Sequence, residues 1–226
     1  MAETLETPVQ RRSFIATYLD PVDSLSEIIF GLIMVLGFTS TARLVFGETS
    51  SYRLVLAVFG CNLAWGIVDG VMYILGSLYE RGQQARLADA LRRAPDDQAA
   101  LAVIARELGP QLAIMDDDQR AEIYRWVLEK VRNSTPQRVR ITKDDIFGAV
   151  ASGLLVFLAV LPVAIPFILV ENPVVALRIS NLICIVLLFV VGYFWAGQTM
   201  MNKFVAGLLL MLLGLIMVAV TVALGG

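Results

Sequence analysis

A single acidic residue, Asp69, lies within a long apolar stretch of the chain, in the sequence NLAWGIVDGVMYILGS from Asn62 to Ser77. The nearest charged residues are Arg53 before it and Glu80 after it. A carboxylate near the centre of a bilayer costs roughly 2.5–3.5 kcal/mol on insertion scales, so it needs a partner or a function. Two interpretations stay open: Asp69 is an ion or proton site, or it is a protonated carboxyl group that hydrogen-bonds across helices and stabilises the bundle.

Helical spacing places polar and small side chains on the same stripe as Asp69. Residues three, four or seven apart share one face of a helix. The stripe consists of Asn62, Gly66, Asp69, Met72, Tyr73 and Gly76. We expect it to face the interior of a helix bundle, with Asn62, Asp69 and Met72 as ligands of a divalent metal ion. A carboxylate combined with a thioether suits Fe(II) or Mn(II) better than Mg(II).

The preceding apolar segment contributes two further candidate ligands, Glu27 and Met34, which lie seven residues apart. We expect Met34 to lie opposite Met72. Glu27 stands at the edge of the apolar run, behind Asp20 and Asp23 at intervals of three and four residues. It either begins an interfacial helix or, together with those two acids, binds the ion at the cytosolic mouth of the pathway.

The elements that must position these residues are membrane-spanning helices. Only 17% of the 226 residues are charged and 58% are hydrophobic, whereas soluble domains have about a quarter charged residues. A transmembrane helix needs roughly 20 mostly apolar residues. Five stretches are candidates: Ile28–Ala42, Leu54–Tyr79, Ile146–Val170, Ile179–Asn202 and Phe204–Gly226. The predicted fold class is therefore all-α, a polytopic membrane protein with five transmembrane helices.

The expected organisation has four parts. Residues 1–24 form a cytosolic N-terminal arm without the features of a signal peptide. Residues 25–79 carry spans one and two, residues 80–145 form a cytosolic helical insert, and residues 146–226 carry spans three to five. The insert contains 12 acidic and 12 basic residues and reads as three amphipathic helices. Its triple acid, Asp116 to Asp118, is interpreted as a helix start, with a weak metal site as the less favoured alternative.

The distribution of basic residues predicts the orientation. Of the 18 lysines and arginines, 15 lie in the N-terminal arm, the insert and the loop before Lys203. The positive-inside rule places these segments in the cytosol and the C-terminus outside. The chain has no histidine, which excludes histidine metal sites and proton relays. No nucleophile–base pair or phosphate loop is present, so we predict no enzyme, no bound cofactor and no nucleic-acid partner.

The layout of two spans, a charged helical insert and three spans resembles the vacuolar iron transporter family in its bacterial branch. Three local features carry the resemblance: SEIIFG at Ser26–Gly31, the spacing of Met72 and Arg81, and the glycine-spaced last span. Pro162 and Pro166 are similar to the proline pair of the family's third span, although they are four rather than three residues apart. In the family an Asn-Asp-Gly sequence follows the matching phenylalanine and glycine, whereas Leu32 follows them here.

The resemblance implies a homodimer in the bacterial inner membrane that exports Fe(II) or a similar divalent metal ion from the cytosol, coupled to inward protons. Asp69 would then take the place of the family's acid in span one. Two functions stay open. One is this metal transport, with Fe(II) or Mn(II) and protons as substrates. The other is a non-transporting membrane protein whose cytosolic insert docks a partner.

Overall fold

The computed structural model describes residues 13–46, 51–135 and 138–223. These residues form helices and connecting turns, and no β-strand occurs within those ranges. Five helical segments are long and apolar enough to cross a bilayer: Pro21–Thr39, Tyr52–Arg93, Lys143–Leu169, Pro173–Gln198 and Lys203–Thr221. The predicted all-α fold with five spans is confirmed.

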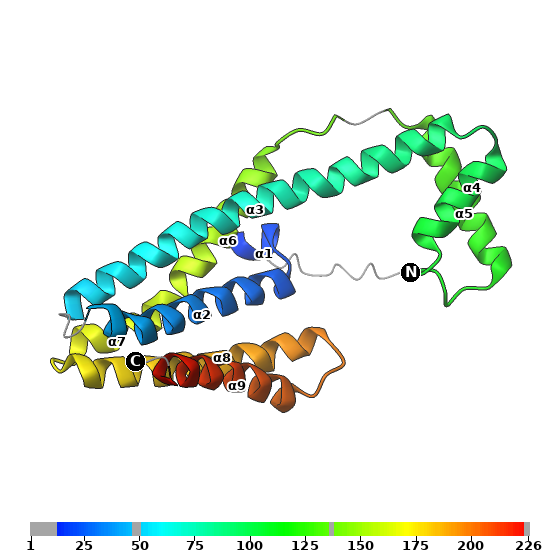
Figure 1. Ribbon diagram of the computed structural model, residues 1–226. Coiled ribbons are helices and arrows are strands. Elements are labelled where there is room, and N and C mark those ends of the chain that lie inside the picture. The colour runs from blue at the N-terminus through cyan, green and yellow to red at the C-terminus, as the bar shows by residue number, and fades with distance from the viewer. Residues whose placement is uncertain (1–12, 47–50, 136–137, 224–226) are drawn as a thin grey trace, which may run out of the picture. The chain divides into compact units, whose positions relative to one another are not determined.

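The elements follow one another along the chain as shown in Figure 1. They are α1 (Phe14–Tyr18), α2 (Pro21–Phe46), α3 (Ser51–Arg93), α4 (Asp97–Leu108), α5 (Asp117–Asn133), α6 (Lys143–Leu158), α7 (Val160–Leu169), α8 (Pro173–Trp195), the 3-10 turn η1 (Ala196–Gln198) and α9 (Lys203–Ala223). The chain divides into two compact units. One consists of residues 1–74 and 143–226, and the other of residues 75–142, which overlaps the predicted insert at 80–145. We call them the membrane unit and the insert unit.

The second span does not end where its apolar residues end. Helix α3 continues without a break for 43 residues, through the charged segment that follows Tyr79, and ends at Arg93. The first of the three helices expected in the insert is thus the end of α3, and the other two are α4 and α5. No proline interrupts residues 80–93, and alanine, leucine, glutamine and arginine are good helix formers. Pro95 then disfavours helical geometry at the residue before it.

The membrane unit is built around α2 and α8. Helix α2 packs against α6, α8 and α9, while α8 also packs against α7 and α9 (Figure 1). Their shared apolar core contains Leu32, Leu36, Val160, Cys184 and Leu188, all nearly inaccessible to solvent. The outward faces of these helices carry exposed leucine, isoleucine, valine and phenylalanine side chains, as expected for surfaces that contact lipid.

The third span contains a break at Ala159, between α6 and α7. Pro162 has no N–H to donate to the carbonyl of Leu158, so the α-helical ladder is interrupted there. Pro162 lies in the first turn of α7, where a missing N–H costs little. Ser180 on α8 donates a hydrogen bond of 2.8 Å to the carbonyl of Val163, which ties the segment after the break to the neighbouring helix.

Glycine residues bring α3 and α6 into close contact. A Cβ atom added at Gly66 would lie 2.7 Å from the carbonyl oxygen of Gly153, and one added at Gly153 would lie 2.5 Å from that of Gly66. Further along the same two helices, Gly148 leaves room for the ring of Tyr73, which a Cβ atom would overlap. Small residues allow helix backbones to approach each other in a membrane. This packing fixes which face of α3 meets α6.

The insert unit has its own small core, formed by Leu91, Ala100, Ile104 and Leu128. Helix α4 is capped by Asp96, whose side chain accepts a hydrogen bond from Ala99 N. Helix α5 begins with a capping box in which Asp116 and Gln119 bond to each other's backbone N–H groups. The interpretation of the triple acid at 116–118 as a helix start is confirmed.

Candidate functional site

Two acidic residues from different helices meet inside the membrane unit. The carboxyl groups of Glu27 on α2 and Asp69 on α3 lie close enough to share a hydrogen bond. Glu27 Oε2 and Asp69 Oδ2 are buried, and neither has a hydrogen-bond donor among the described residues. Buried carboxylate oxygens without donors carry a large desolvation cost, which a proton or a cation relieves.

A third helix completes the group. Ser152 on α6, which is fully buried, donates a hydrogen bond of 2.6 Å to Glu27 Oε1. Ser152 stands next to Gly153, the residue that lets α6 approach α3. The glycine contact that joins these two helices therefore also positions the hydroxyl group beside the carboxyl pair. We call Glu27, Asp69 and Ser152 the carboxyl site.

Sequence reasoning did not identify Ser152. A serine in a run of alanine, glycine and leucine has no signal of its own. The available signal was its position immediately before Gly153, since small residues mark the face of a membrane helix that contacts another helix.

Asn62 lies on the same face of α3, deeper in the span. It is completely buried, and its Nδ2 donates to the carbonyl of Val58 at 3.2 Å. Its Oδ1 is buried without a hydrogen-bond partner in the described part of the chain. Two helical turns, about 10 Å at 1.5 Å per residue, separate it from Asp69 along α3. Asn62 therefore offers a second oxygen ligand further along the same face rather than a ligand at the carboxyl site.

The two candidate methionines are not brought into the carboxyl site. The side chain of Met72 is 60% exposed on the outer surface of the membrane unit. The position of Met72 around the axis of α3 explains this exposure. At 100° per residue, it lies about 110° from the centre of the face that contains Gly66 and Tyr73. Met34 is partly buried and lies two turns, about 10 Å, beyond Glu27 on α2.

Of the two acids before Glu27, Asp20 has a structural role at the start of α2, whereas the carboxylate of Asp23, one turn before Glu27, interacts electrostatically with it. Asp20 Oδ1 accepts a hydrogen bond of 2.8 Å from the backbone N–H of Asp23, which is a helix N-cap. Within the described residues no group of three or more histidine, cysteine, aspartate or glutamate side chains is placed to hold a metal ion. The carboxyl site accordingly offers two acids and a hydroxyl group.

The N-terminal segment packs against α2, α3 and α6 through residues that are neighbours of the carboxyl site in the sequence. Leu19 is buried against Ala151 and Leu155, and Tyr73 and Ile28 pack around it. The hydroxyl group of Tyr73 donates a hydrogen bond of 3.0 Å to the carbonyl oxygen of Tyr18.

Each residue of the carboxyl site has a near neighbour in this layer. Ile28 follows Glu27, Ala151 precedes Ser152, and Tyr73 lies one turn after Asp69. The rings of Phe14 and Tyr18 add an aromatic contact with Phe147 on α6. We call α1 and Leu19, together with the residues they contact, the N-terminal cover.

The sequence of the chain matches a known family. The family model described as the VIT family matches residues 74–226, which is more than half of the chain. The chain belongs to the vacuolar iron transporter (VIT) family. Members of the VIT family are membrane transporters of metal ions, so membership places this multi-pass protein among the metal transporters and not in an enzyme family. No curated protein matches the chain.

The match to the VIT family begins at Ile74 and therefore covers the end of α3, the insert unit and the last three spans. Glu27 and Asp69 lie before it. Ser152 lies within it, in the third span. The assignment of a role to the two acids consequently depends on their contact, their burial and their chemistry.

Proposed function

We propose that this protein transports a divalent metal ion across the bacterial inner membrane in exchange for protons, and that Glu27 and Asp69 bind both. The observation that carries the proposal is the contact between the two carboxyl groups. One oxygen of each, Glu27 Oε2 and Asp69 Oδ2, is buried without a hydrogen-bond donor among the described residues. Two carboxylates together neutralise a 2+ ion. When the ion leaves, one negative charge must be removed, because two like charges in contact in a membrane repel strongly.

The ligand set narrows the choice of ion. Both acids and Ser152 supply oxygen, and Met72, the nearest thioether on α3, points away from them. Carboxylate and hydroxyl oxygens suit hard cations such as Mn(II), whereas a thioether shifts preference toward softer ions. We therefore rank Mn(II) ahead of Fe(II) as the substrate of the carboxyl site.

The exchange follows from the chemistry of the pair. The metal ion displaces the proton held between Glu27 and Asp69, and a proton replaces the ion after release. Ser152 donates a hydrogen bond to Glu27. This bond holds the carboxyl group of Glu27 toward Asp69 both when the metal ion is bound and when the proton is bound. Asn62 Oδ1, further along the same face of α3, provides the next oxygen for a moving ion.

The direction and setting of transport are part of the same proposal. The distribution of basic residues favours a cytosolic N-terminal arm and insert, and in this orientation the N-terminal cover lies on the cytosolic side of the carboxyl site. The cover must move to admit a metal ion from the cytosol, which the protein then exports. We further propose a homodimer, on the basis of the family layout and the exposed glycines Gly60 and Gly76 in α3, where a Cβ atom would meet nothing within 4 Å.

The test is metal flux into proteoliposomes under an imposed proton gradient. We expect Mn(II)-dependent flux for the wild type and loss of flux for Asp69→Asn and for Glu27→Gln. Each of these variants keeps most of the shape of the side chain but removes its charge. Asp118→Asn, which changes an exposed acid of α5, serves as the matched control. Full flux in both site variants would reject the carboxyl site. Absence of flux in the folded wild type would favour a non-transporting protein that docks a partner through its insert.

A further inference from the structure

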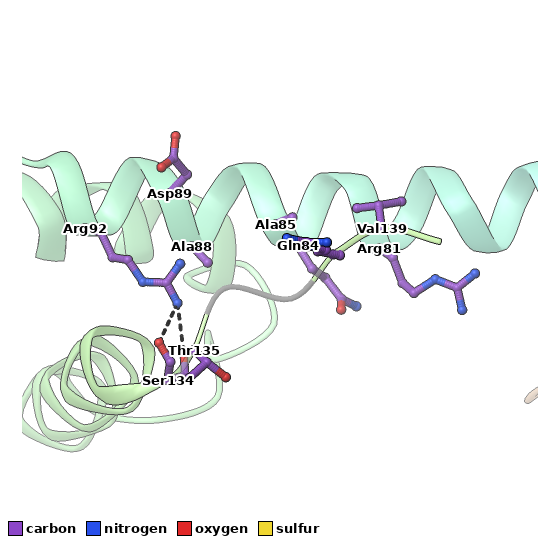
Figure 2. Close-up of a pocket in the computed structure, with 10 residues that line it drawn as sticks. Arg81, Gln84, Ala85, Ala88, Asp89, Arg92, Ser134, Thr135 and Val139 are labelled. Atoms are coloured by element: carbon purple, nitrogen blue, oxygen red, sulfur yellow. Dashed lines mark hydrogen bonds between the residues drawn. The ribbon is translucent and has the colours of Figure 1, made fainter. Parts of the chain in front are cut away.

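The insert unit contains a cavity whose wall is rich in arginine. It has a volume of about 330 Å³ and lies between α3 and the segment that follows α5. Figure 2 shows the side chains of α3 above and Ser134 and Thr135 below. The polar and charged part of the wall consists of Arg81, Gln84, Asp89, Arg92, Ser134, Thr135 and Arg138.

The charge of this wall is positive. It includes three arginines and one acid, Asp89, and Arg81 has an interaction partner of its own, so Arg92 and Arg138 carry the argument. The carboxylate of Asp89 is already paired with Arg93, whose Nε lies 3.0 Å from Asp89 Oδ1, and Arg93 does not line the cavity. In Figure 2 Asp89 points to the opposite side of α3 from Ser134. The segment at 80–145 has equal numbers of acids and bases, so the positive wall is a local concentration of charge and not an average property of the insert.

Arg92 is held in a fixed position at one end of the cavity. Its Nη2 donates to the carbonyl oxygens of Val131 and Ser134, at 3.2 and 3.0 Å, and to Ser134 Oγ at 2.9 Å. These bonds join α3 to the end of α5 (Figure 2). A guanidinium group has five N–H donors, so a group anchored through one nitrogen retains donors for a ligand and loses little side-chain entropy when it binds.

Arg138 supplies a second positive charge to the cavity and, unlike Arg92, has an exposed side chain. Its side chain is exposed and lines the cavity together with Gln84 on α3. An exposed arginine gains little from a surface ion pair. Its charge is therefore accessible to a ligand, and its removal has little effect on the fold.

We propose that this cavity binds a phosphate group. Arginine recognises phosphate through paired, charge-assisted hydrogen bonds, and Gln84, Ser134 and Thr135 add neutral polar groups. The volume lies at the lower end of the range of roughly 300–1,000 Å³ that small-molecule sites occupy. The phosphate belongs either to the headgroup of an anionic phospholipid or to a soluble phosphate compound. Arg81 follows the apolar run that ends at Tyr79 by two residues, which is the depth at which basic residues meet lipid headgroups.

The test uses the full-length protein and two probes. Equilibrium dialysis in neutral detergent measures the binding of inorganic pyrophosphate at constant ionic strength. Native mass spectrometry measures the retention of phosphatidylglycerol against phosphatidylcholine. Arg138→Gln is the test variant. Arg125→Gln, an exposed arginine of α5 that does not line the cavity, is the matched control, and circular dichroism verifies that both variants keep their helix content.

We expect Arg138→Gln to weaken binding of the phosphate probe by about tenfold, the loss expected for one charge-assisted hydrogen bond, while Arg125→Gln matches the wild type. Selective retention of phosphatidylglycerol would assign the site to lipid, and saturable binding of pyrophosphate alone would assign it to a soluble compound. Equal binding by the two variants, or no saturable binding of either probe, would overturn the proposal. Neither measurement depends on metal transport.

Discussion

Ser152 on α6 donates a hydrogen bond of 2.6 Å to Glu27 on α2, and the carboxyl group of Glu27 in turn meets that of Asp69 on α3. Three helices from distant parts of the sequence therefore converge on one pair of acids. The serine hydroxyl fixes the orientation of Glu27, and the close contact between Gly66 and Gly153 fixes the distance between α3 and α6.

Replacement of Ser152 by alanine removes the hydroxyl donor while the two acids remain. A hydrogen bond to a charged group contributes about 1.5–3 kcal/mol, so we expect the apparent metal affinity in the flux assay to fall by about tenfold or more. Ser180→Ala is the control, because Ser180 is equally buried but bonds to the carbonyl of Val163. An unchanged metal affinity in Ser152→Ala would show that the hydroxyl group does not position Glu27.

Replacement of Gly153 by alanine tests the packing of α3 against α6 while the three residues of the carboxyl site remain unchanged. The new Cβ atom would lie 2.5 Å from the carbonyl oxygen of Gly66, so α3 and α6 must move apart. We expect a loss of about 1–3 kcal/mol in stability, as for other overpacked sites, measured as a lower thermal unfolding temperature in detergent. Gly60→Ala is the matched control, since a Cβ atom there meets nothing within 4 Å. Equal melting temperatures for the two variants would contradict the close α3–α6 contact.

Weakening the N-terminal cover should expose the carboxyl site. The reporter is Ser152→Cys in a protein whose Cys61 and Cys184 are replaced by alanine, treated with a membrane-impermeant thiol reagent from the cytosolic side. Leu19→Ala removes a side chain that is 4% exposed, a change that typically costs about 2–5 kcal/mol. We therefore expect the labelling rate to rise by about tenfold or more.

Leu212→Ala is the control for this experiment, because Leu212 is 51% exposed on α9. We expect it to leave the labelling rate unchanged. If Leu19→Ala labels at the same rate as Leu212→Ala, the N-terminal cover does not restrict access to Ser152.

The orientation of the membrane unit is testable with two single cysteines. Glu171, in the turn between α7 and α8, and Gln98, in α4, lie on opposite sides of the membrane in the five-span arrangement. We expect an impermeant maleimide applied to spheroplasts to label Glu171→Cys but not Gln98→Cys until the membrane is permeabilised. The reverse pattern would invert the proposed orientation.

The fold could be predicted from local patterns in the sequence. An apolar run that is long enough to cross the bilayer as a helix predicts a span without any knowledge of tertiary contacts. Asp69 stands out because an acid in such a run is energetically costly. The apolar run gives the extent of the second span but not the end of its helix, which α3 reaches only at Arg93. Helix propensity alone shows no break before Pro95.

The composition of the carboxyl site could be predicted only in part. Helical periodicity shows which residues share a face of one helix, but not which faces of different helices meet. Glu27 and Asp69 were both candidates, yet their contact depends on how α2 and α3 pack. Met72 follows Asp69 by one turn and belongs to the same broad stripe. It lies outside the contact face because the glycine contact with Gly153 centres that face nearer Gly66.

The most direct test of the central claim, that Glu27 and Asp69 exchange a proton for a metal ion, is proton release on metal binding. Purified protein in weakly buffered detergent solution is titrated with Mn(II), and protons are counted with a pH indicator dye. A carboxyl pair that shares one proton should release about one proton per bound ion in the wild type, and Asp69→Asn and Glu27→Gln should release none. Proton release by both variants equal to that of the wild type would contradict the claim.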